Sequence, residues 1–289
     1  MSSLRQLLAG PEIVIAPGVY DGLTTMLATQ AGFKAVYLSG ASLCYARAIP
    51  DIGLLSMSEV AEALGTIRER TEVPIIVDID TGFGNALNVR RTVEVFERRG
   101  ASALQLEDQV TPKRCGHLRD KSVIPASEMV GKIKAALDAR RSSEMLLIAR
   151  TDAAAVEGFE RALDRADAYA EAGADLIFVE APRSKEQLAA IAKRFAGRKP
   201  VMANMVEGGQ TPLLSAAELQ ALGFQLVIFP GGTVRALAFA LQQYFTSLKS
   251  NGTTAPFRDR MLDFAGINRL LGTDDFLARG KAYDREAAE

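Results

Sequence analysis

The chain repeats one pattern along its length: an amphipathic segment that ends at a glycine, followed by a short apolar run. The glycines include Gly32, Gly100, Gly173 and Gly223, and each stands where a helix commonly ends in a left-handed residue. Apolar side chains in the segments recur three or four positions apart, the spacing of one helix face. Examples are Val89, Val93 and Phe96, and then Met129, Ile133 and Leu137.

Eight such apolar runs predict strands at residues 13–16, 35–38, 74–77, 103–106, 146–149, 176–179, 201–203 and 226–229. Eight βα units in 289 residues predict a (β/α)8 TIM barrel. An open doubly wound sheet is the alternative, but no G-x-G-x-x-G follows the first run. Ser56 with Glu59 has the spacing of a helix capping box. We expect one domain over residues 1–289, with 251–289 as a C-terminal helical extension.

The composition excludes several classes of protein. With 48% hydrophobic and 24% charged residues, the chain has the composition of an ordinary globular protein, and a net charge of −1 provides no basic surface for nucleic acid. No apolar stretch reaches the roughly 18 residues of a membrane span, and residues 1–10 lack a signal-peptide core. Two cysteines and one histidine exclude a disulfide framework and a multi-histidine zinc site. We expect a cytoplasmic protein.

Two aspartates, Asp78 and Asp80, follow the apolar run 73–77 and precede a glycine-rich loop. Because strand side chains alternate between faces, both carboxylates point the same way, as oxygen ligands of Mg²⁺ or Mn²⁺ would. Two solvated aspartates in a turn are the alternative. Polar residues also end the other predicted strands, and in a TIM barrel these ends meet at one mouth. They are Tyr37, Ser39, Glu107, Arg150, Asp152, Glu180, Asn204 and Glu207, and Asp51 comes from the loop after the second strand.

The segment 111–121 after the fourth strand is long and charged for a connection in a barrel. Five basic side chains surround Cys115 in the sequence, and such a field is expected to lower the pKa of its thiol. A charged surface loop with an incidental cysteine is the alternative. Cys44 lies in a less charged stretch, and we expect it to serve packing.

These motifs resemble the isocitrate lyase/phosphoenolpyruvate mutase superfamily from about residue 5 to residue 250. The similarity rests on Tyr37 to Gly40, Asp78 to Asn85, Glu107 to Gln109, Lys113 to His117, Ala149 to Ala153 and Asn204 to Leu213. The resemblance implies a Mg²⁺-dependent barrel, with Mn²⁺ as the other metal, and a loop after strand four that closes over the substrate. It also implies a homo-oligomer, a dimer or a tetramer, in which neighbours exchange the last helix.

The resemblance also implies roles for single residues. Asp78 would bind the metal directly, while Asp51, Asp80 and Glu107 hold its waters. The residues expected at the reacting bond are Cys115, Arg150, Glu180, Tyr37, His117 and Lys113. The residues expected to bind a small carboxylate substrate are Ser39, Gly40, Ala41, Gly116, Asn204, Glu207, Thr211 and Arg235.

The function implied is cleavage of the C–C bond in a 2-hydroxy dicarboxylate, with Cys115 as the proton donor. Phe264 aligns with an arginine of methylisocitrate lyases, and Pro230 aligns with a serine or threonine of oxaloacetate-acting members. We therefore expect a substrate like 2,3-dimethylmalate, giving pyruvate and propionate. The alternatives are a 2-methylisocitrate lyase, a carboxyphosphonoenolpyruvate mutase, an oxaloacetate hydrolase and a non-catalytic ligand-binding barrel.

Overall fold

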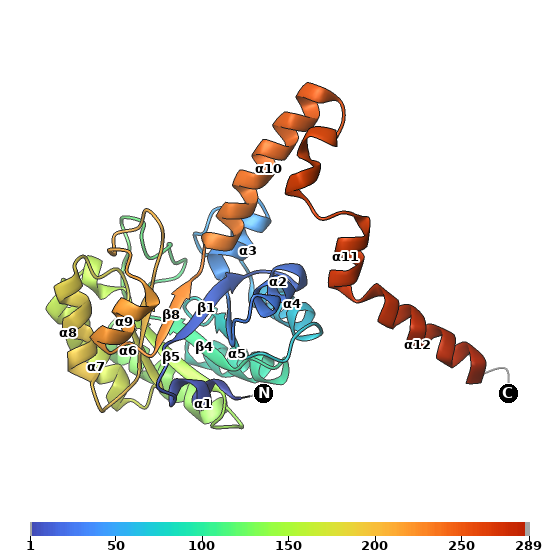
Figure 1. The fold of residues 1–289 in the computed structure, drawn as a ribbon. Coiled ribbons are helices and arrows are strands. Elements are labelled where there is room, and N and C mark those ends of the chain that lie inside the picture. Colours follow the sequence, from blue (N-terminus) through green and yellow to red (C-terminus); the bar gives the residue numbers. More distant parts are fainter. Residues whose placement is uncertain (1, 287–289) are drawn as a thin grey trace. The chain divides into compact units, whose positions relative to one another are not determined.

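The computed structural model describes residues 2–286, and its centre is a closed barrel of eight parallel strands (Figure 1). Each strand pairs with the next along the chain, and β8 pairs with β1. The strands are β1 Val14–Val19, β2 Val36–Leu38, β3 Ile75–Asp78, β4 Ala103–Glu107, β5 Leu146–Thr151, β6 Leu176–Val179, β7 Val201–Asn204 and β8 Leu226–Phe229. Each of the eight predicted runs overlaps one strand, so the TIM barrel is confirmed.

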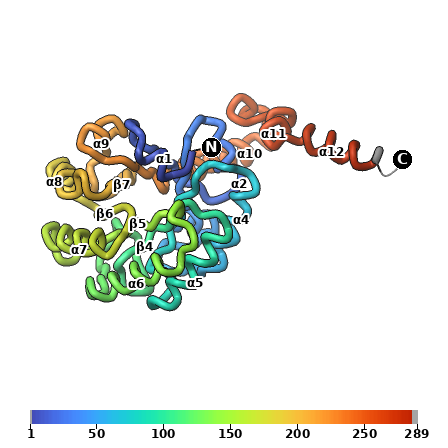
Figure 2. The backbone as a smooth tube through the Cα atoms, turned by 90° about the horizontal axis from the view of Figure 1, so that it is seen from below, coloured from blue at the N-terminus to red at the C-terminus, as the bar shows by residue number. Residues whose placement is uncertain are grey.

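Helices follow the strands and surround the barrel (Figure 2). They are α2 Gly22–Gln30, α3 Gly40–Ala46, α4 Met57–Arg68, α5 Ala86–Arg98, α6 Ala126–Ala139, α7 Phe159–Glu171, α8 Lys185–Phe195 and α9 Ala216–Leu222. The predicted capping box of Ser56 and Glu59 begins α4. Gly223 ends α9 with a φ of 105°, a left-handed conformation that suits a residue without Cβ. The apolar stripe of α5 at Val89, Val93 and Phe96 is fully buried.

Two apolar layers hold the barrel together. One lies between the strands and the helices, and the other fills the inside of the barrel. The inner layer is closed at the amino ends of the strands by Leu4 of α1, Leu4–Leu8. Because side chains alternate along a strand, the inward positions of β5 run from Leu146 through Ile148 to Arg150. The inner core therefore gives way to polar side chains toward the carboxyl ends of the strands.

The structure divides into two compact units, Met1–Val234 and Arg235–Glu289. The boundary lies within α10, Gly232–Asn251, and the second unit continues with η2 Ala255–Arg260, α11 Phe264–Leu271 and α12 Thr273–Glu286. Phe239, Phe245 and Phe276 are among the exposed apolar side chains of this unit. The single domain with an extension over 251–289 stays a prediction, as does the exchanged helix, and residues 287–289 lie outside the described part. Among the described residues, no helix is both long and apolar enough to cross a membrane.

Candidate active site

The predicted carboxylates gather at the mouth of the barrel, the carboxyl-terminal ends of the strands, with an ammonium group among them. Lys113 Nζ lies 2.5 Å from Asp51 Oδ1 and 3.0 Å from Asp80 Oδ1, and all three side chains are largely buried. Burial raises the pKa of Asp80 to about 6, and Lys113 opposes this shift while Asp78 adds to it. Burial alone would lower the pKa of Lys113, but Asp80 and Asp51 raise it well above its ordinary value. Lys113 is therefore a cation that neutralises part of this acidic cluster.

The donor chemistry of the cluster fits a hard divalent cation. Asp51, Asp78, Asp80 and Glu107 supply carboxylate oxygens, and Glu107 Oε1 is buried without a hydrogen-bond partner. Among residues 2–286, however, no three histidine, cysteine, aspartate or glutamate side chains are arranged so that they could hold a metal ion. The ammonium of Lys113 accounts for this in part, because it lies against the same oxygens that a cation would use. The predicted metal ligands thus lie together, and their ligand roles stay a prediction.

A hydrogen-bond chain connects this cluster to β2. Tyr37 Oη donates to Gln105 Oε1 at 2.6 Å, and Gln105 Nε2 donates to Asp78 Oδ1 at 3.2 Å. Burial, with Asp78 nearby, raises the pKa of Tyr37 well above its usual range, so the phenol stays protonated at neutral pH. Gln105 was not among the predicted site residues. The alternation of inward positions in β4, from Ala103 through Gln105 to Glu107, is the sequence pattern that indicates it.

Arg150 is held at the end of β5 by two carboxylates. Its Nε and Nη2 donate to Asp152 at 2.8 and 3.0 Å, and Nε lies 3.3 Å from Glu107 Oε2. The ring of Phe178 lies below the guanidinium, 5.2 Å from its central carbon. Burial would raise the pKa of Asp152, but Arg150 and Lys121 hold it well below its usual range. Asp152, which was expected at the mouth but had no predicted role there, thus fixes the orientation of Arg150.

Glu180, after β6, connects two further predicted residues. His117 Nε2 lies 3.1 Å from Glu180 Oε1, and Asn204 Nδ2 donates to the same oxygen at 3.2 Å. The backbone N–H of Gln210 donates to His117 Nδ1, so the proton of a neutral ring is on Nε2, facing Glu180. Asn204 Oδ1 and Thr211 Oγ1 are buried without hydrogen-bond partners, which makes them candidate contacts for a polar ligand.

The loop 111–121 folds over the mouth of the barrel. A Cβ placed on Gly116 would lie only 2.3 Å from Arg150 Nη2 and 2.5 Å from Glu180 Oε1, so the loop backbone packs directly on these groups. Cys115 is partly buried, and its N–H donates to the carbonyl of Asp51 at 3.1 Å. Burial, with Asp51 nearby, raises the pKa of this thiol to about 11.

The predicted lowering of the Cys115 pKa is therefore wrong. Lys113 and the backbone N–H of His117 do lower this pKa, but burial and the Asp51 carboxylate outweigh them, and Lys113 and Lys121 are themselves paired with Asp51 and Asp152. Cys44 is buried in the apolar layer, in agreement with its expected packing role, and its Sγ also lies 4.0 Å from Asp51 Oδ1.

Comparison with known proteins places this arrangement in a family. Residues 4–249 match the family of phosphoenolpyruvate phosphomutase. The chain is 43% identical to 2,3-dimethylmalate lyase of Eubacterium barkeri, over 94% of each chain. It is 44% identical to 2-methylisocitrate lyase of Aeropyrum pernix, over 99% of this chain and 92% of the relative. The chain belongs to the phosphoenolpyruvate mutase/isocitrate lyase superfamily.

Solved structures of this superfamily share the fold. Crystalline 2,3-dimethylmalate lyase, in its trigonal form, matches with a TM-score of 0.89 at 35% identity, covering 95% of this chain and 91% of the other. Phosphonopyruvate hydrolase in complex with oxalate and Mg²⁺ matches with a TM-score of 0.86 at 33% identity, covering 95% of each chain. A related barrel thus contains Mg²⁺ together with a small dicarboxylate.

The remaining residues that were expected to bind the substrate form two groups. Ser39, Gly40 and Ala41 lie at the start of α3, and Glu207 and Arg235 lie later in the chain. Ser39 caps α3, and Gly40 at its start faces the carboxylates, since a Cβ there would lie 3.1 Å from Asp78 Oδ2. Ala41 follows Gly40 in the first turn of that helix. Glu207 is exposed in the loop after β7. Arg235 begins the second unit, and the structure does not place it relative to the mouth.

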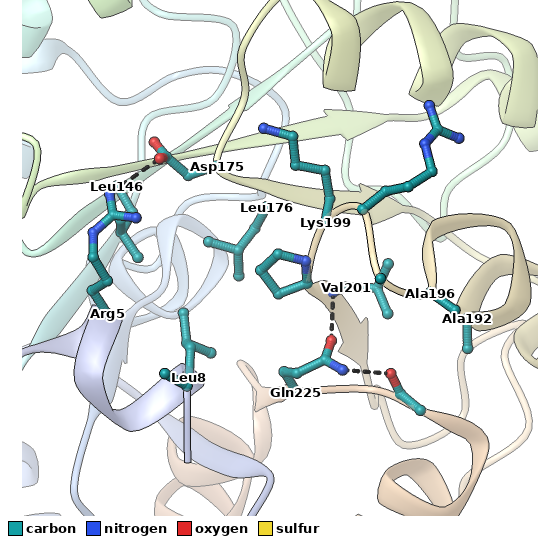
Figure 3. Close-up of a pocket in the computed structure, with 15 residues that line it drawn as sticks. Arg5, Leu8, Leu146, Asp175, Leu176, Ala192, Ala196, Lys199, Val201 and Gln225 are labelled. Carbon is teal, nitrogen blue, oxygen red and sulfur yellow. Dashed lines mark hydrogen bonds and ion pairs between the residues drawn. The ribbon is translucent and has the colours of Figure 1, made fainter. Parts of the chain in front are cut away.

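A separate cavity of about 410 Å³ lies at the opposite end of the barrel, near the amino ends of β5 to β7 (Figure 3). Arg5 pairs with Asp175 there at 3.1 Å, and Gln225 bonds the backbone of Val201 and Gly223. Hydrogen bonds within the protein thus satisfy these polar groups, unlike Asn204 and Thr211 at the mouth. The mouth is therefore the candidate active site of this superfamily member.

Proposed function

We propose that the chain is a carbon–carbon lyase that cleaves a 2-hydroxy dicarboxylate of the 2,3-dimethylmalate type to pyruvate and propionate. The observation that supports it best is the meeting of a fixed arginine, a protonated thiol and a carboxylate cluster under one loop. The proposal agrees with the lyase names of the relatives at 43% and 44% identity.

Different residues of the mouth have different roles in this reaction. When bound at Asp78 with Asp51, Asp80 and Glu107 around it, Mg²⁺ or Mn²⁺ would polarise the carboxylate and hydroxyl of the substrate. Tyr37 keeps its proton, which it donates to Gln105, so its oxygen can accept a hydrogen bond near the substrate hydroxyl but does not act as a base.

Cleavage itself moves one electron pair and two protons between defined groups. The hydroxyl gives its proton to a carboxylate of the mouth, its oxygen becomes the keto oxygen of pyruvate, and the electrons of the broken C–C bond pass to the departing carboxylate fragment. Arg150 stabilises the negative charge that develops on this fragment. Cys115, whose pKa of about 11 keeps the thiol protonated at neutral pH, donates its proton to the carbon. The loop that carries it keeps water from this intermediate.

Cleavage of 2-methylisocitrate is the second candidate function. It is favoured by relatives of that name, including one from Bacillus subtilis at 42% identity over 99% of this chain. The residue after β8 disfavours oxaloacetate as the substrate, because Pro230 has no hydroxyl and its carbonyl already accepts from Ser42 Oγ at 2.7 Å. Phe264, the aligned counterpart of a substrate-binding arginine, lies in the second unit, which the structure does not place relative to the mouth.

A substrate panel separates these candidates. Pyruvate, glyoxylate and oxalate release would be measured with 2,3-dimethylmalate, 2-methylmalate, 2-methylisocitrate, isocitrate and oxaloacetate. An aromatic ring in place of an arginine loses charge-assisted hydrogen bonds of about 1.5–3 kcal/mol, so kcat/KM should favour dicarboxylates by roughly ten- to a hundred-fold. A clear preference for 2-methylisocitrate would overturn the assignment based on Phe264, and fastest release of oxalate would overturn the one based on Pro230.

Self-association and a cytoplasmic location belong to the same proposal. A homotetramer or dimer that exchanges the last helix would cover exposed apolar side chains of the second unit, such as Phe239, Phe245 and Phe276. We propose no nucleic-acid or membrane partner, in keeping with the net charge of −1.

A further inference from the structure

Lys121 lies at the base of the loop and is buried between two acceptors that the proposed reaction does not use. Its side chain is 2% exposed, and Nζ donates to Asp152 Oδ1 at 2.9 Å and to the carbonyl of Gly116. The resemblance assigns no role to Lys121. Burying an ammonium group costs free energy. An ammonium that donates to two acceptors also holds both of them in one geometry.

The carboxylate of Asp152 is shared between the loop and the catalytic arginine. Oδ1 accepts from both Lys121 Nζ and Arg150 Nη2, and Oδ2 accepts from Arg150 Nε. Asp108 fixes Asp152 from behind, because it accepts from the N–H of Asp152 at 2.9 Å and from Thr151 Oγ1 at 2.7 Å. The position of Asp152 therefore determines the positions of both Lys121 and Arg150.

The base and the tip of the loop differ in how they are held. At the base, the N–H of Val110 donates to the carbonyl of Ser122, and the N–H of Ile124 donates to the carbonyl of Asp108. Lys121 therefore lies next to a hydrogen-bonded stretch of backbone. At the tip, Gly116 packs on Arg150 without room for a side chain. The bond from Lys121 to the Gly116 carbonyl joins these two parts of the loop.

We propose that Lys121 is a positioning residue that ties the loop tip at Gly116 to the carboxylate that orients Arg150. The same ammonium thus holds the loop over the mouth and fixes Asp152 beneath it. Loop closure and the orientation of the arginine are coupled through one buried atom, Asp152 Oδ1. The inference rests on the proposed function for its kinetic part only.

The test compares Lys121→Met with Arg119→Met, which removes an exposed cation from the same loop. Hydrogen exchange of backbone amides 112–118 in the free protein should be at least about tenfold faster in Lys121→Met and within about twofold of wild type in Arg119→Met. Asp152→Asn should accelerate the same amides. Unchanged exchange in Lys121→Met, or equal acceleration in Arg119→Met, overturns the proposal.

Kinetics then distinguish positioning from a purely structural role. We expect kcat of Lys121→Met to fall about 10- to 100-fold and KM to rise by less, because the groups at the strand ends still bind the substrate. A KM effect alone overturns the proposal. If Lys121→Met does not fold, Lys121→Gln, which keeps a donor but removes the charge, is measured in the same way. No turnover on any substrate of the panel, together with faster exchange in Lys121→Met, refutes the proposed function and retains the coupling.

Discussion

The replacement of Gly116 by alanine tests whether the loop must pack on the reacting groups. The added Cβ would lie 2.3 Å from Arg150 Nη2 and 2.5 Å from Glu180 Oε1. Neither neighbour is free to withdraw, because Arg150 is fixed by Asp152 through two hydrogen bonds and Glu180 accepts from Asn204. The loop must therefore move instead.

The expected loss of rate follows from the distance by which the loop must move to make room for the added Cβ. Ordinary contact of a methyl carbon needs about 3.5 Å, so the loop must withdraw by about 1 Å. A displacement of that size at a reacting group costs about 10²-fold in rate, or about 2.7 kcal/mol of barrier. Because Cys115 is the residue before Gly116, the displacement falls on the proposed proton donor. We expect kcat to fall about 100-fold while KM changes less.

The assay couples pyruvate release to NADH oxidation by lactate dehydrogenase, with 2,3-dimethylmalate as the first substrate. Gly131→Ala is the matched control, since Gly131 lies in α6 and a Cβ there meets no atom within 4 Å. That variant should keep wild-type kcat and gain about 0.5–1 kcal/mol of stability, because alanine is the better helix former. A Gly116→Ala enzyme with kcat within threefold of wild type would refute the packing argument.

Three further predictions concern the metal and the thiol. Excess EDTA should abolish turnover, Mg²⁺ should restore it, and Asp78→Ala should not be rescued; full activity in EDTA would remove the metal from the mechanism. Cys115→Ser should lower kcat by about 10²–10⁴-fold with little change in KM, whereas Cys44→Ser in the apolar layer should be nearly silent, and equal effects would contradict the assignment. Because the pKa of Cys115 is raised to about 11, iodoacetamide should react slowly at pH 7 and roughly tenfold faster for each pH unit up to that value; rapid reaction at pH 7 would show a thiolate instead.

The barrel was predictable because its strands are short apolar runs set off by glycine and by polar ends. The same rule placed Asp78, Glu107 and Arg150 correctly at the mouth, since each ends an apolar run. Asp152 was expected at the mouth without a role, and Gln105 was not selected, although it occupies an inward position two residues before Glu107. Extending the two-residue alternation from β3 to every strand would have found it.

Other features depend on contacts that no local pattern contains. The pKa of Cys115 is raised chiefly by burial of the thiol and then by Asp51 beside it, whereas proximity in sequence to basic side chains predicted the opposite. The unit boundary at residue 234 falls inside α10, a continuous helix that begins at Gly232, so the chain has no linker at the boundary itself.

The charges at the mouth explain why these residue types occur together. Among the described residues, six largely buried carboxylates lie at the mouth together with three buried cationic side chains. The carboxylates belong to Asp51, Asp78, Asp80, Glu107, Asp152 and Glu180, and the cations are Lys113, Lys121 and Arg150. Burial is the largest cause of the raised pKa of Asp80 and Glu107, and the negative charge of neighbouring carboxylates adds to it. A divalent cation would remove most of the excess of negative charge, so the charge balance and the carboxylate donors favour the same ligand.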